Sequence, residues 1–117
     1  MTGNFSKSLL SGSTNGKQIK ITATVAGSAV TLHTAVSGTS AADEIWLYAT
    51  NTSTASVLLT ICWGGTTAPD NNILTIIPPQ SRVLICDGIL LQNSLVASAF
   101  AAVANVIAMD GFVNNIT

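Results

Sequence analysis

Apolar and polar residues alternate with a period of two over most of this chain, and this pattern restricts the fold more than any other feature. In residues 18–26 every second position is apolar, namely Ile19, Ile21, Ala23 and Val25. The alternation recurs in residues 29–36, 44–51 and 56–63, with shorter versions at 72–79 and 82–88. Because the side chains of a β-strand point alternately to its two faces, these segments predict strands.

Turn residues separate the predicted strands. Gly27-Ser28 predicts a hairpin between the first two strands, residues 51–56 join the next pair, and Pro78-Pro79 ends a strand because proline cannot donate to a ladder. Roughly seven or eight short strands at this spacing predict an all-β fold, an antiparallel β-sandwich or a jelly-roll-like barrel. The 117 residues suit a single domain, which we place at 18–117. The polar, glycine-rich residues 1–17 are predicted to form an extended N-terminal arm.

The last third of the chain allows two interpretations. Residues 95–101 and 104–111 can form two strands, and their β-branched residues favour this. The same stretch is rich in alanine and places apolar residues on one helical stripe: Leu95, Ala99, Ala102, Val106 and Met109. We expect strands, because the rest of the chain is β-patterned, but the helix stays an alternative.

Charged residues make up only 8% of the chain, against about 25% in an ordinary domain. Segments such as 56–63 are uncharged on both predicted faces, so we expect their outer face to meet another subunit. Four basic residues form no basic patch, and we therefore expect no nucleic-acid partner. The uncharged stretch between Asp87 and Asp110 is interrupted by polar residues and has no basic anchor, so no membrane span is expected either.

The residues that carry chemistry are few. His33 is the only histidine, lies in the middle of a predicted strand, and is expected to be hydrogen-bonded to a neighbour. The start of the chain lacks a signal-peptide pattern, so we expect Cys62 and Cys86 to be buried reduced thiols. These groups are too few for a closed zinc site, and Asp43-Glu44 are interpreted as an exposed turn before a strand. We expect no metal, no cofactor and no enzymatic activity.

The stretch ICWGGTTAPD (61–70) raises the question of a phosphate-binding loop. Such a loop needs a following lysine and a helix N-terminus, whereas here a predicted strand follows Pro69. We therefore interpret it as a connecting loop at the rim of a sheet. Trp63 is either an interface anchor or a core residue. The full set of interface candidates is Trp46, Tyr48, Trp63, Leu58, Leu9 and Leu10.

Several segments resemble a family of small structural proteins of tailed bacteriophages, the head decoration or cement proteins. The distinctive segments are LHTAVSGT (32–39), DEIWLYATN (43–51) and WGGTT (63–67), and the resemblance covers nearly the whole chain after about residue 8. It implies a β-sandwich, made in the cytoplasm of the host bacterium, that sits on the outer capsid surface of the virion. It also implies homotrimers that bind the major capsid protein and tie capsomers together. No residue role is implied.

Three functions are weighed from these observations. The first is a capsid decoration protein. The second is a tail- or fibre-associated module that stacks a host glycan on Trp46, Tyr48 and Trp63. The third is a small hydrolase built around His33, whose nucleophile and orienting acid cannot be named from sequence.

Overall fold

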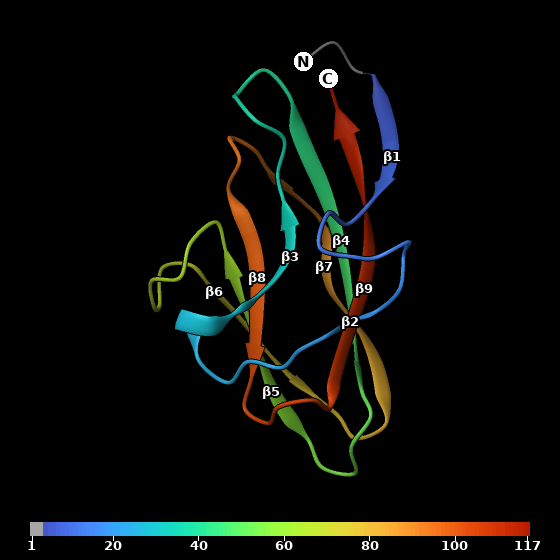
Figure 1. Cartoon of the computed structure of the whole chain (residues 1–117), viewed down its shortest axis with the longest axis vertical. Helices are drawn as coiled ribbons and strands as arrows, with labels where there is room; N and C mark the ends of the chain where they lie inside the picture. The colour runs from blue at the N-terminus through green and yellow to red at the C-terminus, as the bar shows by residue number, and fades with distance from the viewer. Residues whose placement is uncertain (1–3) are drawn as a thin grey trace.

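Two antiparallel β-sheets pack face to face in the computed structural model, which describes residues 4–117 (Figure 1). Sheet A contains β1 (Phe5–Leu9), β2 (Ile19–Lys20), β4 (Ala42–Asn51), β7 (Ser81–Leu91) and β9 (Ile107–Ile116). Sheet B contains β3 (Val30–Thr34), β5 (Val57–Trp63), β6 (Asn72–Ile77) and β8 (Val96–Ala101). A short 3-10 helix, η1 (Ala26–Ser28), precedes β3.

The strand order is that of a jelly roll. Sheet A runs β1-β9-β4-β7, with β2 also paired to β9, and sheet B runs β3-β8-β5-β6. The paired strands are nested, β2 with β9, β3 with β8, β4 with β7 and β5 with β6, so the chain resembles one long hairpin wrapped into two sheets. The predicted all-β antiparallel sandwich is therefore confirmed.

The core lies between the sheets and follows the period-two pattern. Alternate residues of β4 from Ile45 onward are buried, whereas β5 is buried continuously from Leu59 to Cys62, with Leu59 and Ile61 in the core between the sheets. Sheet A adds Ile107 and Met109 from β9, and sheet B adds alanines from β8. The main contributors from β3, β4 and β5 are Leu32, Ile45, Leu47, Leu59 and Ile61. Each such side chain contributes about 1.5–3 kcal/mol by leaving water, which makes the alternation the main determinant of the fold.

The predicted hairpin at Gly27-Ser28 is wrong. β2 belongs to sheet A and β3 to sheet B, and η1 lies on the crossover between them. Residues 51–56 likewise connect β4 in sheet A to β5 in sheet B. Turn residues indicate where the chain reverses, and the same residues serve a hairpin and a crossover between sheets.

Only Ile19–Lys20 of the strand predicted over residues 18–26 is a strand. Ile21 and Ala23 are nevertheless buried, because the segment crosses the end of the sandwich and bonds to it. Ile21 exchanges backbone hydrogen bonds with Ile107 and Asn105, and Ala101 donates to the Ala23 carbonyl. The burial pattern of a strand is thus preserved by an irregular segment.

The helical alternative for the last third is wrong, and the two-strand prediction is confirmed. These residues form β8 and β9, which lie in opposite sheets, and β9 starts at Ile107 and continues to Ile116. Asn105 takes a positive φ of 69° in the intervening turn, a conformation that asparagine tolerates well. The β-branched residues therefore decide the structure against the helix propensity of alanine.

Part of the predicted N-terminal arm is the strand β1, which pairs with β9 from Phe5↔Ile116 to Leu9↔Phe112. All five residues of β1 are exposed. Leu10, immediately after the strand, turns into the core and is 2% exposed. Residues 1–3 of the arm lie outside the described residues.

Candidate functional site

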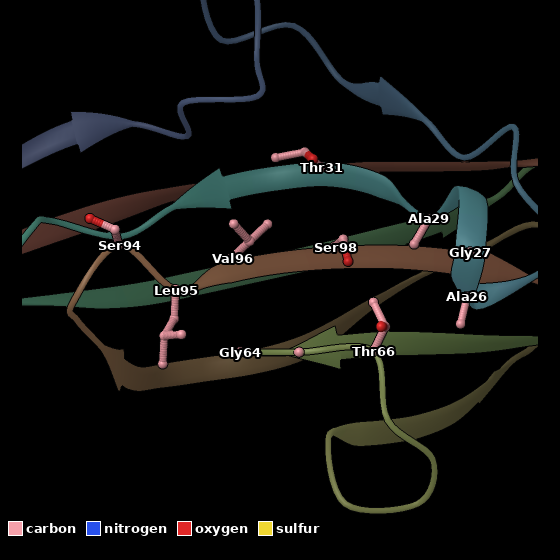
Figure 2. A pocket seen from close by; sticks show the side chains of 11 residues that line it. Ala26, Gly27, Ala29, Thr31, Gly64, Thr66, Ser94, Leu95, Val96 and Ser98 are labelled. Carbon is pink, nitrogen blue, oxygen red and sulfur yellow. The ribbon is translucent and has the colours of Figure 1, made fainter.

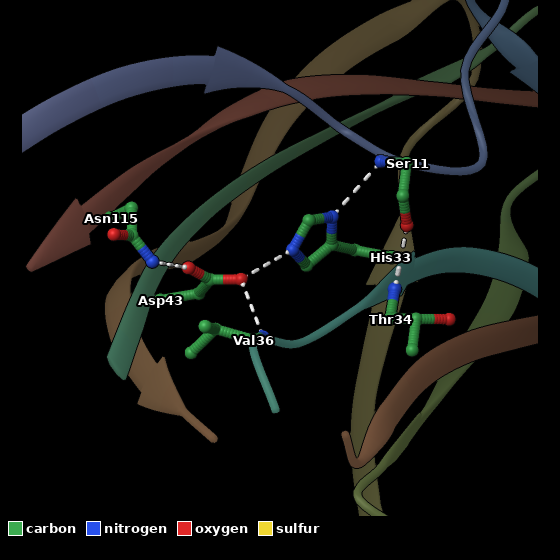
Figure 3. Close-up of polar contacts among 6 residues, drawn as sticks. All are labelled: Ser11, His33, Thr34, Val36, Asp43 and Asn115. Carbon is green, nitrogen blue, oxygen red and sulfur yellow. Dashed lines mark hydrogen bonds and ion pairs between the residues drawn. The ribbon is translucent and has the colours of Figure 1, made fainter. Parts of the chain in front are cut away.

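His33 lies at the centre of a buried polar cluster between β3, β4 and the segment after β1 (Figure 3). The Ser11 backbone N–H donates to His33 Nδ1 at 2.9 Å, so the imidazole carries its proton on Nε2. Nε2–H then donates to Asp43 Oδ2 at 2.8 Å. Asp43 also accepts from the Val36 backbone N–H at 3.0 Å and from Asn115 Nδ2 at 2.7 Å. The cluster thus joins four segments of the chain.

The cluster has the residue types of a Ser-His-Asp triad without its geometry. The backbone N–H of Ser11, rather than its hydroxyl, contacts the imidazole, and it occupies the lone pair that a general base would use. Ser11 Oγ instead accepts the Thr34 backbone N–H at 2.7 Å. The prediction of a hydrogen-bonded imidazole is confirmed, and the arrangement stabilises the fold.

The prediction that Asp43-Glu44 form an exposed turn before a strand is wrong, because both residues lie within β4 and Glu44 is half-buried. Asp43 is the second residue of β4 and only 5% exposed. A buried carboxylate is tolerated where hydrogen-bond donors surround it, and His33, Val36 and Asn115 supply them. Val36 and His33 lie within ten residues of Asp43, but Asn115 is 72 positions away, and the local pattern could not reveal the contacts that the fold makes.

Cys62 and Cys86 are free and buried, as predicted. Burial raises the pKa of the Cys86 thiol to about 12 and also raises that of Cys62. Within residues 4–117 no group of three or more His, Cys, Asp or Glu side chains is placed to hold a metal ion. In the same residues, no helix is long and apolar enough to span a membrane.

The loop after Trp63 connects β5 to β6, as predicted. It borders a groove of about 410 Å³ that also touches η1 and the turn before β8 (Figure 2). Glycine, alanine, serine and threonine dominate the lining, and Leu95 and Val96 are its largest side chains. No charged side chain lines this groove in the described structure, so it offers an anion nothing beyond hydroxyl and backbone groups.

The outer face of sheet A is a network of aromatic and charged side chains that satisfy one another. Trp46 stacks on Phe112 with ring centroids 5.8 Å apart. The Lys7 ammonium group lies over the Phe112 ring. Arg82 lies over the Tyr48 ring and forms a bidentate ion pair with Asp110, which raises the pKa of the guanidinium. The aromatic rings on this face therefore already have partners within the sheet.

The outer face of sheet B is apolar and exposed near β6, whereas Thr60, Cys62 and Ser98 on the same face are buried. Leu58 is 42% exposed, Leu74 61% and Ile76 66%. Leu58 pairs with Ile76, and Thr60 lies between Leu74 on one side and Phe100 on the other. We call Leu58, Leu74, Ile76 and Phe100 the apolar patch.

Charge is divided unequally between the two sheets. The four strands of sheet B, all within the described residues, contain no Asp, Glu, Lys or Arg. Most charged residues of the chain lie on strands of sheet A: Lys7, Lys20, Asp43, Glu44, Arg82, Asp87 and Asp110. The strands of sheet A also expose large apolar side chains, namely Phe5, Leu9, Leu84, Ile89 and Leu90, so the two sheets differ in charge rather than in apolar exposure. An exposed apolar patch on an uncharged sheet is typical of an interaction surface.

The structure distributes the interface candidates over different environments. Leu58 belongs to the apolar patch, and Leu9 is exposed on β1. Leu10 is a core residue and presents no surface for an interface. Trp63 is half-buried against the core, as the core interpretation expected, and Trp46 and Tyr48 belong to the network of sheet A.

Leu74 and Ile76 are not among the interface candidates predicted from sequence, although the apolar pattern of residues 73–77 indicates them. In ILTII (73–77) both are apolar and lie on the face opposite Ile73, Thr75 and Ile77. When a strand is apolar on both faces, the face turned away from the core exposes apolar side chains to solvent. Its position at the edge of sheet B could be seen only from the topology.

A scan against protein-family models, a search of curated proteins and a search of solved structures found no match. The function is therefore argued from the surface of the molecule and from the resemblance of its segments.

Proposed function

We propose that this chain is a structural protein of a bacteriophage virion, a capsid decoration protein that binds the outer surface of the head as a homo-oligomer and stabilises it. The observation that carries the proposal is the apolar patch on an uncharged sheet. Leaving Leu74 and Ile76 in water costs free energy that contact with another protein surface recovers.

A decoration protein stabilises by binding the assembled shell and not its parts. Each contact can be weak, because many copies on a symmetric shell multiply it. With sheet B against the shell, the polar network of sheet A would face solvent. This orientation keeps the charged side chains of sheet A in water and buries the apolar patch of sheet B against protein.

The resemblance supports the same proposal. Its segments fall on β3 and the loop after it, on β4, and on the end of β5 with its glycine loop, so they specify parts of the fold rather than a site. The implied assembly is a homotrimer on the major capsid protein. A jelly roll serves capsid proteins and lectins alike, so the fold alone does not choose between these classes.

The glycan-binding alternative is less favoured by the aromatic residues. Phe112 stacks on Trp46, Arg82 lies over Tyr48, and Trp63 packs against the core. A sugar needs an open ring face on which to stack. A hydrolase at His33 is less favoured for a similar reason, since Ser11 offers its backbone and not its hydroxyl to the imidazole.

Binding to heads tests the proposal directly. Purified protein is added to phage heads that lack it, and the bound fraction is measured by sedimentation together with the temperature at which the heads release DNA. We expect binding and a higher release temperature. Ile76→Lys should weaken binding, whereas Leu84→Lys should not, because Leu84 is exposed on β7 of sheet A.

Two outcomes would count against the proposal. Wild-type protein that stays in the supernatant at every concentration would remove the decoration function. Equal weakening by Ile76→Lys and Leu84→Lys would remove the assignment of the binding face to sheet B. Glycan-array binding that Trp63→Ala abolishes would favour the alternative.

A further inference from the structure

Each sheet has two edges: β1/β2 and β7 in sheet A, and β3 and β6 in sheet B. Three of these four edges are protected against pairing with another chain. The β1/β2 edge carries Lys7 and Lys20. The β7 edge has two register shifts against β4 and carries Arg82 and Asp87. Lysines, other charges and bulges are the usual devices that prevent edge-to-edge association.

The β3 edge of sheet B is protected in a different way. Its pairing with β8 shifts register between Thr31 and His33. The segment after β1 also covers it, because Gly12 donates its backbone N–H to the Leu32 carbonyl and Ser11 Oγ accepts the Thr34 N–H. The Leu32 carbonyl and the Thr34 N–H of β3 are therefore already used.

The β6 edge has none of these devices. Asn72–Ile77 contains no charge and no proline, and its pairing with β5 runs without a register shift. Its two outward side chains, Leu74 and Ile76, are the most exposed members of the apolar patch. An apolar, regular edge of this kind pairs with another strand unless something prevents it.

We infer that β6 pairs antiparallel with β6 of a second copy, so that two B sheets become one continuous eight-stranded sheet. This inference rests on the proposed self-association and names its interface, which is two-fold and therefore gives a dimer in place of the trimer that the resemblance implies. Trp63 donates its backbone N–H to the Asn71 carbonyl at 2.7 Å, which sets the alternation of the β5–β6 ladder. Leu74 and Ile76 then direct their N–H and C=O groups away from β5, toward the partner strand, whereas the Asn72 N–H already donates to the Pro69 carbonyl.

A second copy fits this edge better than a different partner does. A two-fold contact sets the same strand against itself, and an uncharged aliphatic strand meets its own copy without like-charge repulsion. In the register centred on Thr75, Leu74 of one copy lies opposite Ile76 of the other, and Ile76 opposite Leu74. The pairing also places two apolar patches side by side, which doubles the uncharged surface available to a shell.

The test uses charge complementation at residue 74. By size-exclusion chromatography with light scattering, wild-type protein should have twice the 12.0 kDa mass of the chain. Leu74→Lys and Leu74→Glu should each be monomeric, since the two like charges then occupy neighbouring diagonal positions across the two-fold axis, and an equimolar mixture of the two should recover the dimer. Ile76→Lys with Ile76→Glu is a second pair of the same design. Leu84→Lys with Leu84→Glu is the matched control, which should stay dimeric throughout.

Circular dichroism confirms that each variant is folded, and a pair that fails to fold is replaced by the other pair. Wild-type protein that is monomeric at all concentrations would overturn this inference and the proposed self-association. A mass of three chains, or dimers that survive both lysine substitutions, would overturn the β6 contact alone. Sedimentation of wild-type protein with heads would still support the decoration function in that case.

Discussion

His33 Nε2 donates a 2.8 Å hydrogen bond to Asp43 Oδ2 where both side chains are nearly excluded from solvent. The pair joins β3 of one sheet to β4 of the other, next to the point where Ser11 leads the N-terminal segment across the β3 edge. Buried polar contacts of this kind are costly when broken, so the pair holds the edge of sheet B closed.

Replacing Asp43 with alanine should lower the free energy of unfolding by about 3 kcal/mol. The substitution leaves donors on His33, Val36 and Asn115 without an acceptor in a site that excludes water. Urea unfolding, followed by circular dichroism, measures the change. Asp70→Ala is the control: Asp70 is an exposed loop residue, and its loss should change stability by less than about 0.5 kcal/mol. Equal stability of Asp43→Ala and wild type would contradict the role of the cluster.

Gly111→Ala should destabilise the protein by about 2 kcal/mol or more. A Cβ atom at Gly111 would lie 1.9 Å from the Trp46 carbonyl oxygen, so β9 and β4 would have to separate. Gly27→Ala is the matched control, because a Cβ there meets nothing within 4 Å and the residue needs no positive φ. Its stability should stay the same or rise by up to about 1 kcal/mol. Thermal unfolding compares the two variants, and a Gly111→Ala midpoint at the wild-type temperature would refute the close approach.

The strands were predictable because burial between two sheets imposes a period of two on the sequence. Leu59 and Ile61 follow it on β5, and even the irregular residues Ile21 and Ala23 do. The crossovers were not predictable, because Gly27-Ser28 has the same residue types in a hairpin and in a connection between sheets. Local pattern therefore gives the strands, and the pairing of distant segments gives the topology.

The candidate surface was only partly predictable. Two apolar faces on residues 73–77 indicated an uncovered outer face, but the edge position of β6 follows from the strand order. The burial of Asp43 was missed because its donors come from positions as distant as Asn115. Leu10 and Leu9 are adjacent and equally apolar, and only the path of the chain after β1 buries one and exposes the other.

Both thiols should resist modification in the folded protein. At about pH 8 the raised pKa of Cys86, about 12, and the raised pKa of Cys62 keep both groups protonated, and burial blocks the reagent. A thiol-reactive chromophore should therefore label both only after urea unfolding. Ser8→Cys, on the exposed strand β1, should react at once in the folded state and serves as the positive control. Rapid labelling of Cys62 without denaturant would show that sheet B opens locally at β5, and rapid labelling of Cys86 would show the same for sheet A at β7.

Glu44 should make stability depend on pH in the acidic range. Hydrogen bonds from Asn114 and then from Trp46 to its carboxylate lower the pKa of Glu44 from 4.5 in the folded protein. A carboxyl whose folded pKa is lowered contributes stability above its unfolded pKa and loses that contribution as pH falls through the folded value.

The measurement compares wild type with Glu44→Gln, which keeps an oxygen acceptor but cannot ionise. Urea unfolding at about pH 6 and at about pH 3 gives the difference in stability between the two proteins at each pH. The advantage of wild type should be largest at the higher pH and should shrink on acidification, because only the wild-type protein carries the ionisable carboxyl at position 44. A difference that stays constant between the two pH values would mean that the Asn114 and Trp46 contacts do not favour the ionised form in solution.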